Sequence, residues 1–391
     1  MSENVATPEA PTAAAAAPQA QKVISPDLKF VNDVISSGGE SLKKCYQCAT
    51  CTVVCNVTPE DNPFPRKEML QAQWGLKDDL FRNPDIWLCH QCSDCTAHCP
   101  RGAKPGEVLG AIRKMSIVRH SKPAFMAKLA GSPVGLAPLL ALPIVLFLIF
   151  LNMVGHVPFT KAFETSGGQI IFSDFLPLLP YLDGTFVTIF TLAAVVLGLG
   201  ILSYWKDMSK ATKPTGSLVG SIIGTLVDIL KHDRFGKCDV ASGRRWAHML
   251  VFFGFVLLAI ATAFAGFYEW VLHLHGPYPF SDPIKWFGLS GSVALALGFV
   301  LVVINRLAIA GKAGIGSYYD WLFIGVIMTV GATGILAMVV RLANMPGPAY
   351  TIYFVHLVSI FFLFAYAPYT KMAHMVYRAT AMVFARMTGR D

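Results

Sequence analysis

Charged side chains are scarce in this sequence. Asp, Glu, Lys and Arg make up 14% of the 391 residues, whereas 54% are apolar, and an ordinary soluble domain carries roughly a quarter charged residues. This shortage excludes a protein that is soluble along its whole length. The mean hydropathy of +0.52 leaves room for several membrane spans and one soluble domain of about 100 residues.

Cysteine is nearly absent from most of the chain. Eight of the nine cysteines fall between positions 45 and 99, and Cys238 stands alone. This distribution excludes a disulfide framework that runs through the whole chain, and it indicates one compact thiol site instead.

The first 25 residues lack both a periodic apolar face and a basic start before their alanine run. We therefore expect residues 1–25 to be a disordered tail and not a signal peptide. The soluble domain that follows, residues 26–130, is then expected to stay in the cytoplasm.

Long apolar runs begin near residue 133 and reach the roughly 17–25 residues that cross a hydrocarbon core. Because these runs show few polar faces, membrane spans are favoured over core helices of a soluble protein. Residues 131–391 are thus predicted to be a membrane domain. Its six spans are expected at about 135–155, 184–205, 246–271, 286–308, 318–341 and 351–376.

Basic residues fall almost wholly on one side of these spans. Only Lys161, Lys285 and Arg341 lie in the other connections, and cytoplasmic loops carry the excess of Lys and Arg. Both termini are therefore expected in the cytoplasm. The net charge of +8 reflects topology and attraction to lipid headgroups, and no sequence feature points to nucleic acid.

The connection 206–245 contains an apolar residue at every fourth position, from Leu218 to Leu230. This spacing predicts a helix at about 217–231. We expect it to lie in the membrane interface, with docking of a partner helix as the alternative.

The strongest chemical signal is a repeated cysteine motif. Both CYQCATCTVVCN and CHQCSDCTAHCP have the spacing C-x2-C-x2-C-x3-C, and Pro100 follows the second. In this bacterial ferredoxin pattern three cysteines bind one [4Fe–4S] cluster and the fourth binds the other. The spacing therefore predicts two clusters, with these ligand sets: Cys45, Cys48, Cys51 and Cys99 for cluster 1, and Cys89, Cys92, Cys95 and Cys55 for cluster 2.

Zinc is the main alternative, because paired C-x2-C units also build tetrahedral zinc sites. Four cysteines in each of two runs exceed what zinc needs. Disulfides are disfavoured because cytoplasmic thiols stay reduced.

Histidines inside a span are costly and usually have a function. His356 and His374 both fall in the predicted span 351–376, and eighteen residues make five helical turns. Both side chains would then share one face, roughly 27 Å apart. His248 falls at the cytoplasmic start of the third span, at the depth of His374. A pair at one depth suits an inner haem b held by His248 and His374, the alternative being interfacial residues at helix ends.

An outer haem at His356 lacks a clear partner, since the facing position near Ala265 is not a histidine. His275 and His156 are the candidate ligands, and a five-coordinate or absent second haem are the alternatives. The sequence thus predicts one or two haems. Arginines near span ends are candidate partners of haem propionates or simple interfacial anchors: Arg244, Arg245 and Arg341.

Three segments carry a resemblance to known families. The cysteine region resembles the C subunit of heterodisulfide reductases. RRWAHMLVFFGF at 244–255 and VHLVSIFFLFAYAPYTKMAH at 355–374 resemble the haem b membrane subunits of heterodisulfide and respiratory nitrate reductases. The fusion of both in one chain resembles the C subunits of the quinone-interacting membrane-bound oxidoreductases of sulfate reducers.

That resemblance implies a mainly α-helical subunit of a bacterial cytoplasmic membrane complex that exchanges electrons with menaquinone. Its implied partners are flavin and iron–sulfur subunits similar to heterodisulfide reductase A, and adenylylsulfate reductase. His248, His356 and His374 match three of the four haem ligands of the nitrate reductase pattern, and Leu258 stands where the fourth would be. By analogy the quinone pocket lies near His356 and the outer loops, with these candidate lining residues: Tyr268, Glu269 and His275.

Several functions therefore compete. The leading hypothesis is a quinone-linked electron-transfer subunit acting in sulfate reduction. The alternatives are a heterodisulfide reductase-type or other respiratory subunit, and a passive membrane anchor of an iron–sulfur enzyme. An ion pump is disfavoured because Glu269 and Asp320 lie near span ends and not in mid-membrane.

Overall fold

The computed structural model describes residues 24–156, 170–240 and 243–390, so the predicted disordered tail lies almost wholly outside the described residues. Within those ranges the chain is helical and contains no strand, which confirms the mainly α fold class. The helices, in chain order, are α1 (Leu28–Ser36), α2 (Thr50–Val53), α3 (Arg66–Gln73), α4 (Lys77–Phe81), α5 (Asp85–Leu88), α6 (Asp94–Ala97), α7 (Pro105–His120), α8 (Ala124–Ala130), α9 (Leu136–Met153), α10 (Phe172–Phe175), α11 (Asp183–Ala211), α12 (Leu218–Lys231), α13 (Arg244–Phe267), α14 (Pro283–Ala308), α15 (Ala310–Ala313), α16 (Tyr318–Leu342), α17 (Pro346–Ala365) and α18 (His374–Met387).

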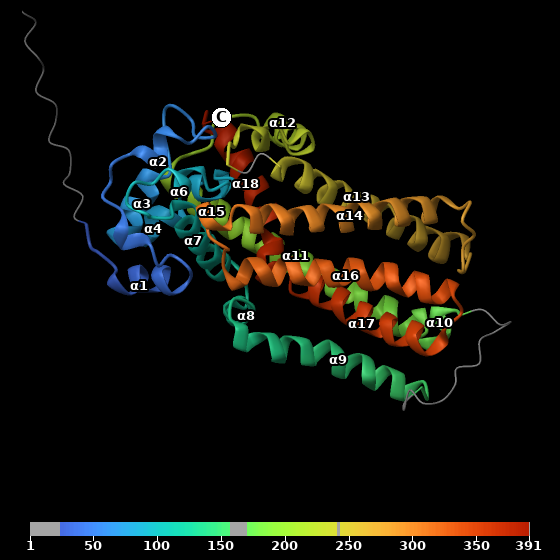
Figure 1. Cartoon of the computed structure of the whole chain (residues 1–391). Helices are drawn as coiled ribbons and strands as arrows, with labels where there is room; N and C mark the ends of the chain where they lie inside the picture. Colours follow the sequence, from blue (N-terminus) through green and yellow to red (C-terminus); the bar gives the residue numbers. More distant parts are fainter. Residues whose placement is uncertain (1–23, 157–169, 241–242, 391) are drawn as a thin grey trace, which may run out of the picture.

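The N-terminal helices gather at one end of a bundle of long helices (Figure 1). Helix α7 is the centre of this end, because α1, α3, α5 and α6 all pack on it. Its buried side chains Val108, Leu109 and Ile112 join Phe30 and Trp87 in one apolar core. Removing these side chains from water is the main force that holds the short helices in place.

The segment between the two cysteine runs is more broken than the helix-like region 64–86 seen in the sequence. It forms the three short helices α3, α4 and α5. Gly75 separates the first two with a φ of +68°, a conformation that glycine adopts without the strain a side chain would add. The chain can thus fold back on itself within about twenty residues.

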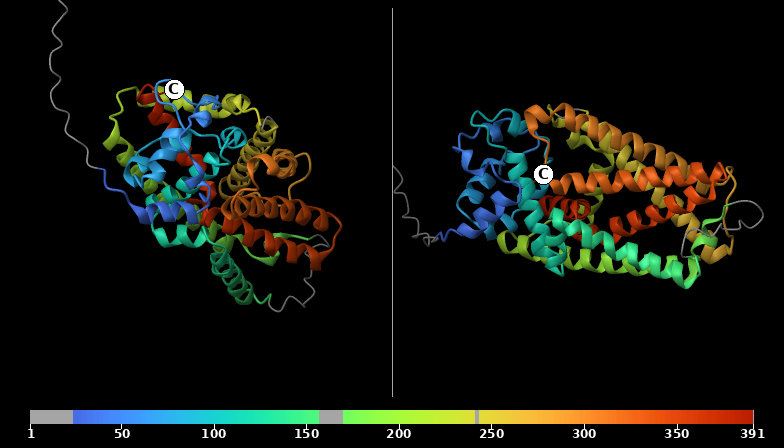
Figure 2. Two further views of the ribbon diagram at one scale, coloured as in Figure 1. Left: turned by 60° about the vertical axis from the view of Figure 1, so that its left-hand side comes forward. Right: turned by 60° about the horizontal axis from the view of Figure 1, so that its bottom comes forward.

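In the part of the chain that the structure describes, six helices are long and apolar enough to cross a membrane. They run side by side, and two further views show the same arrangement (Figure 2). Much of their outer surface is made of exposed leucine, valine and phenylalanine side chains, a surface that suits lipid and not water. These helices indicate a multi-pass membrane protein. Their bounds are Pro133–Met153, Leu178–Ala211, Arg244–Leu272, Pro283–Ala308, Tyr318–Leu342 and Pro346–Ala365.

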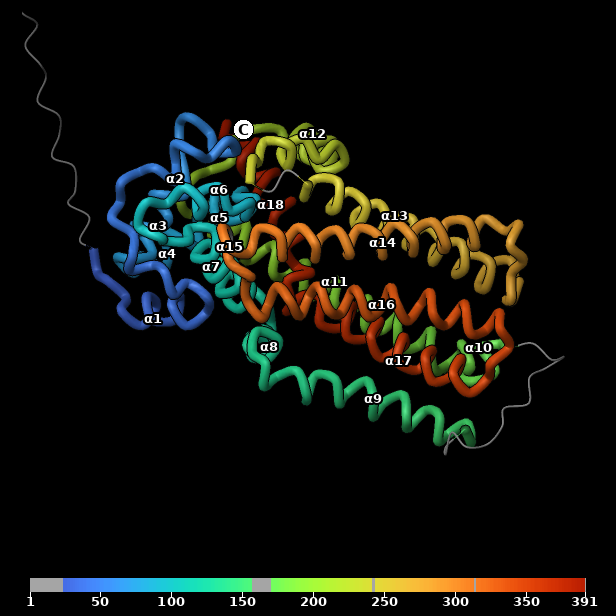
Figure 3. The backbone as a smooth tube through the Cα atoms, viewed as in Figure 1, coloured from blue at the N-terminus to red at the C-terminus, as the bar shows by residue number. Residues whose placement is uncertain are grey.

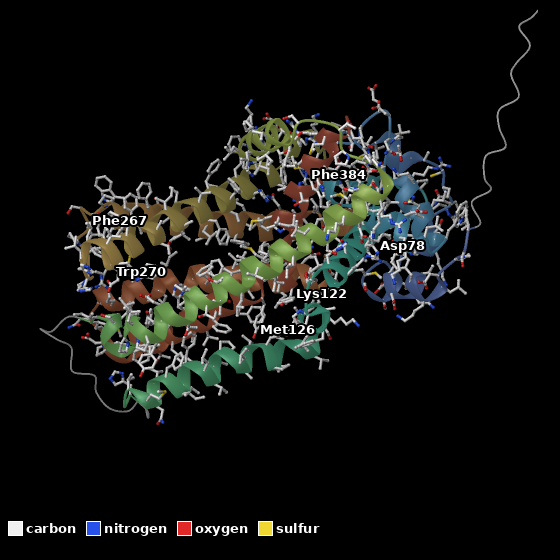
Figure 4. All side chains as sticks on the ribbon, turned by 180° about the vertical axis from the view of Figure 1, so that it is seen from behind. Asp78, Lys122, Met126, Phe267, Trp270 and Phe384 are labelled. Carbon is white, nitrogen blue, oxygen red and sulfur yellow. The ribbon has the colours of Figure 1, made fainter. Side chains whose placement is uncertain are left out.

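Figure 4 shows that Phe267 and Trp270 lie at the end of the bundle far from Asp78 of the N-terminal region. The Trp270 indole donates to the Asp183 carboxylate at 3.0 Å. An amphipathic tryptophan at a helix end is typical of a membrane–water interface. The cysteine-rich region therefore covers one end of the bundle, and the aromatic side chains of Phe267 and Trp270 lie at the other end.

The last predicted span, 351–376, is wrong as a single helix. Helix α17 ends at Ala365, two short turns follow, and α18 starts at His374. Pro368 lies in the break, where its ring and missing N–H prevent a continuous helix. His356 and His374 therefore lie on different helices and are not separated by five turns of one helix. In Figure 3 the chain continues after α17 toward the N-terminal region, where α18 lies.

Helix α18 joins the two parts of the molecule. The Tyr377 ring stacks on Trp87 of α5 with centroids 5.3 Å apart. Beyond the helix, Arg390 pairs with the buried Asp85 carboxylate at 2.6 Å. The C-terminal helix is thus part of the packing of the cysteine-rich region, although it follows the last span.

Helix α12 coincides with the amphipathic segment expected at about 217–231. It packs against α18, and Arg386 of α18 pairs with Asp228 of α12 at 2.8 Å. Its other face exposes Val219, Ile223 and Leu230. This arrangement leaves an apolar helix face at the same end of the bundle as the cysteines (Figure 1).

Candidate metal and haem sites

The two cysteine runs fold in the same way. In the first, Gln47 and Ala49 have φ values of +60° and +68°, and in the second, Gln91 and Ser93 have φ values of +52° and +75°. A one-turn helix, α2 or α6, follows each pair. The repeated positive φ angles curl each loop so that three closely spaced cysteines approach one another.

The first group of thiols contains members of both runs. Cys45, Cys48 and Cys51 line one small pocket together with Cys99 from the other run. The Cys51 thiol is within electrostatic reach of the other three. This is the set that the crossed pattern predicted for cluster 1.

The second group mirrors the first. The Cys95 thiol is within electrostatic reach of Cys89 and Cys92 of its own run and of Cys55 from the first run. The Cys55 thiol in turn interacts with Cys89 and Cys92. Each run thus lends its fourth cysteine to the other group.

The thiols fit iron–sulfur clusters chemically. Burial raises the pKa of the Cys51 thiol to about 11 and that of Cys55 to about 12. Without a cation these thiols are protonated at neutral pH, and iron binding must displace the protons. A cluster supplies the positive charge that buried thiolates need.

Three arginines hold the second cysteine loop through its backbone. Arg113 of α7 donates to the Cys89 carbonyl at 2.8 Å. Arg244 of α13 donates to the Gln91 carbonyl at 2.7 Å, and Arg378 of α18 donates to the Cys89 carbonyl at 3.3 Å. Arg244, a sequence candidate for haem propionates, thus contacts the cysteine loop, and it also lines the large cavity between the long helices. The loop is fixed by the helix that precedes the membrane domain and by two helices within it.

One large cavity of about 2560 Å³ lies between the long helices, and His248, His356 and His374 all line it. Most of its other lining side chains are apolar, including Leu258 and Ala265. The volume and the combination of imidazoles with an apolar wall fit haem groups, which need axial nitrogens and exclusion of water.

His248 and His374 lie within electrostatic reach of each other across the helices α13 and α18. The Nδ1 atom of His374 lies 2.6 Å from the Lys371 carbonyl oxygen, and Nδ1 of His248 lies 3.0 Å from Nε2 of His232. Among the described residues, neither Nε2 atom makes a hydrogen bond. Both imidazoles thus keep Nε2 free, the nitrogen that a haem iron would require.

His356 also has its hydrogen-bond partner at Nδ1. Its Nδ1 lies 2.9 Å from the Thr333 hydroxyl. It packs against Gly334, where a Cβ would lie 3.0 Å from the imidazole. From the third span, Leu258 and Ala265 line the same cavity, and the sequence holds no histidine between His248 and His273.

The two candidate second ligands of an outer haem differ in whether they line the cavity. His156 does not line the cavity, and its Nδ1 lies 2.7 Å from the Phe175 carbonyl oxygen. His275 does line the cavity, is 69% exposed and pairs with Glu269 at 2.9 Å. Of the proposed quinone-lining residues, Glu269 and His275 reach the cavity and Tyr268 does not.

The segment between α12 and α13 contributes residues to the cysteine region that no sequence motif indicated. Cys238 is buried and does not stand alone, because its sulfur lies within 4.8 Å of Cys92 and the Asp94 carboxylate. That carboxylate accepts the backbone N–H groups of Asp239 at 3.1 Å and Val240 at 2.9 Å. These contacts join residues about 145 positions apart, so no local pattern reveals them.

Two family models cover most of the chain. Residues 41–103 match the 4Fe-4S dicluster domain, and residues 128–391 match citrate utilization protein B. The dicluster match supports two [4Fe–4S] clusters. No solved structure is significantly similar to the chain.

Three relatives illustrate the range. The chain is 25% identical to citrate utilization protein B of Escherichia coli over 93% of this chain and 95% of that protein. It is 33% identical to the C subunit of the H(2):CoB-CoM heterodisulfide,ferredoxin reductase of Methanothermobacter marburgensis, over 26% of this chain and 52% of the relative. It is 27% identical to the E subunit of the dihydromethanophenazine:CoB--CoM heterodisulfide reductase of Methanosarcina thermophila, over 44% of this chain and 69% of the relative.

The chain spans about half the length of the reductase C subunits that it matches. These C subunits and the Methanosarcina E subunit are all named as parts of heterodisulfide reductases. Together with the dicluster domain, these relatives indicate a membrane iron–sulfur electron-transfer subunit of an oxidoreductase complex. Because the family model covers residues 128–391, the chain belongs to the citrate utilization protein B family, and it carries a 4Fe-4S dicluster domain before that region.

Proposed function

We propose that the chain exchanges electrons between menaquinol and cytoplasmic flavin and iron–sulfur subunits, through haem b and two [4Fe–4S] clusters. His248 and His374 are the proposed axial ligands of the inner haem, and the two crossed cysteine groups are the proposed cluster ligands. The observation that carries the proposal is the short link between them. Phe235 contacts both the His248 ring and the His90 ring, and His90 follows Cys89 in the chain.

When bound, haem b would supply one-electron redox chemistry inside the membrane. The chain's own residues supply the surroundings. His248 and His374 line the cavity, and most of the other side chains that line it are apolar. The number of haems per chain decides whether His356 would hold a second haem. That haem would be held by His275 as well, or by His356 alone.

Menaquinol is the proposed membrane substrate. Its oxidation to menaquinone releases two electrons and two protons, and the reverse reaction takes them up. At the far end of the bundle, Glu269 and His275 form a pair at 2.9 Å that lines the cavity and reaches solvent. We assign to this pair the transfer of protons between the quinone site and the outer solution.

The cytoplasmic exit is proposed at the first cysteine group. Cys48 is exposed, and next to it Tyr46 is 68% exposed with Arg101 over its ring at 4.1 Å. A partner flavin or iron–sulfur subunit docked there would approach the proposed ligands of cluster 1. This orientation places both termini and residues 26–130 in the cytoplasm, the membrane domain at 131–391, and α12 on the lipid surface.

The proposed setting is the bacterial cytoplasmic membrane, with a heterodisulfide reductase A-like subunit and adenylylsulfate reductase as partners in sulfate reduction. A second setting is favoured by the near full-length similarity to a protein named for citrate utilization. There the same route would serve a cytoplasmic enzyme that acts on citrate or a related organic acid. Adding each partner enzyme to membranes that contain the full chain distinguishes the two settings.

Redox titration of the purified full chain tests the proposal. Optical spectra are expected to show haem b bands, and electron paramagnetic resonance is expected to show two reduced clusters. His374→Ala should remove the inner haem and prevent reduction of the clusters by menaquinol. The control His156→Ala should leave both unchanged, since His156 does not line the cavity. Normal cluster reduction in His374→Ala would contradict the assignment of His374 as a ligand of the inner haem.

A further inference from the structure

His232 lies directly behind one of the proposed haem ligands. It is the first residue after α12, has a φ of +54°, and is 3% exposed. The His232 ring contacts the rings of Phe252 and Phe253, with centroids 5.1 Å and 6.3 Å away. The side chain is therefore held in one orientation by packing, and both of its nitrogens have partners.

Those partners form a chain of hydrogen bonds. Nδ1 of His232 lies 3.3 Å from the Leu230 carbonyl oxygen, and Nε2 of His232 lies 3.0 Å from Nδ1 of His248. A carbonyl oxygen only accepts, so Nδ1 of His232 carries the hydrogen. In the neutral imidazole, Nε2 of His232 is then an acceptor, and Nδ1 of His248 must be the donor.

This order fixes the state of His248. With its proton on Nδ1, His248 keeps a free lone pair on Nε2. His248 also lines the large cavity. The reverse order would place the proton of His248 on Nε2 and would prevent iron binding. His232 cannot replace His248 as the ligand without giving up one of its two hydrogen bonds.

We propose that His232 is a positioning residue for the inner haem: it accepts a hydrogen bond from Nδ1–H of His248 and so holds His248 in the iron-binding tautomer. This inference rests on the proposed function, since it assigns a role toward the proposed haem. An acceptor behind a ligating histidine fixes the ring and raises the basicity of the ligand, and losing such a partner typically weakens binding about 10–100-fold. A more basic ligand stabilises the oxidised iron, so His232 is expected to lower the midpoint potential of the inner haem.

The test uses the purified full chain, with haem content, haem affinity and the midpoint potential from an optical redox titration as readouts. His232→Leu removes the acceptor and is expected to weaken haem binding on the order of 10–100-fold and to raise the potential. His232→Gln has an unbranched side chain at the same φ but carries an oxygen acceptor, and it should restore both values at least in part. Phe253→Leu changes the packing against His232 without removing an acceptor, and it should behave as the wild type.

The outcomes separate the two proposals. A wild-type chain without haem overturns the proposed function. Haem present with an unchanged affinity and potential in His232→Leu overturns the role of His232 and leaves the proposed function standing. Equal losses in His232→Leu and His232→Gln also overturn it, because a purely structural role does not distinguish an acceptor from a methyl group.

Discussion

The ring of Phe235 stacks on the imidazole of His248, with centroids 4.6 Å apart and planes at 30°. The same phenyl ring meets His90 edge-on at 4.7 Å. Phe235 comes from the connection between α12 and α13, whereas His90 belongs to the second cysteine run. One side chain thus fills the space between a proposed haem ligand and the neighbour of a proposed cluster ligand.

Phe235→Ala is expected to slow electron transfer between the haem and the clusters at least severalfold, because a packed contact is replaced by a gap. The midpoint potentials should change little, since Phe235 binds neither group. Rapid-mixing optical spectroscopy after addition of menaquinol measures the rate. Phe235→Leu refills part of the space and should give an intermediate rate. An unchanged rate in Phe235→Ala would show that electrons take another route.

Arg244→Leu is expected to loosen the second cysteine loop. Arg244 donates to the His90 carbonyl at 2.9 Å and to the Gln91 carbonyl at 2.7 Å, and a hydrogen bond from a charged group contributes about 1.5–3 kcal/mol. Iron release to a chelator should therefore be faster. Arg245→Leu is the matched control, because Arg245 binds Asp233 and the Lys231 carbonyl and not the cysteine loop. Equal release in both variants would contradict the assignment.

Paired cysteine substitutions test the crossed ligand sets. Cys45→Ala with Cys99→Ala removes two proposed ligands of cluster 1 and should leave cluster 2 intact. Cys89→Ala with Cys99→Ala removes one proposed ligand from each set and should impair both clusters. Iron content and the resonance spectra of the reduced proteins report the result. If the second pair spared one cluster fully, each run would bind its own cluster.

Glu68→Gln should change how stability depends on pH. Glu68 is fully buried next to Asp85, and burial raises its pKa to about 7. An acid with a raised pKa in the folded state binds its proton more tightly than in the unfolded state, so stability falls as the pH rises from about 4.5 to about 7. Glutamine cannot ionise and keeps an oxygen for Asn83, which donates at 2.8 Å. Chemical denaturation should show that the free energy of unfolding falls less between pH 5 and pH 8 in Glu68→Gln than in the wild type. An identical fall in both proteins would contradict this account.

The sequence predicted the features that depend on local patterns. The repeated cysteine spacing anticipated the two mixed groups of thiols. In this spacing three closely spaced cysteines bind one cluster, and the fourth binds the other. Apolar length anticipated six long helices. The four-residue spacing from Leu218 anticipated α12. Each of these signals lies within one stretch of chain.

Contacts between distant segments were missed. His232 faces His248, and Cys238 faces Cys92, only because the connection after α12 folds over the cysteine region. The break before His374 had a local signal in Pro368, which was outweighed by the apolar run around it. His248 and His374 nevertheless line one cavity and lie within electrostatic reach of each other, although they are on different helices.

Anaerobic addition of a reduced menaquinone analogue to the purified full chain tests the central claim most directly. Haem b absorption and the cluster resonance signals are followed in the same sample. We predict that the haem bands change to the reduced form and that cluster signals grow with them. The absence of haem b bands, together with clusters that only a strong chemical reductant reduces, would contradict electron transfer from quinol through this chain.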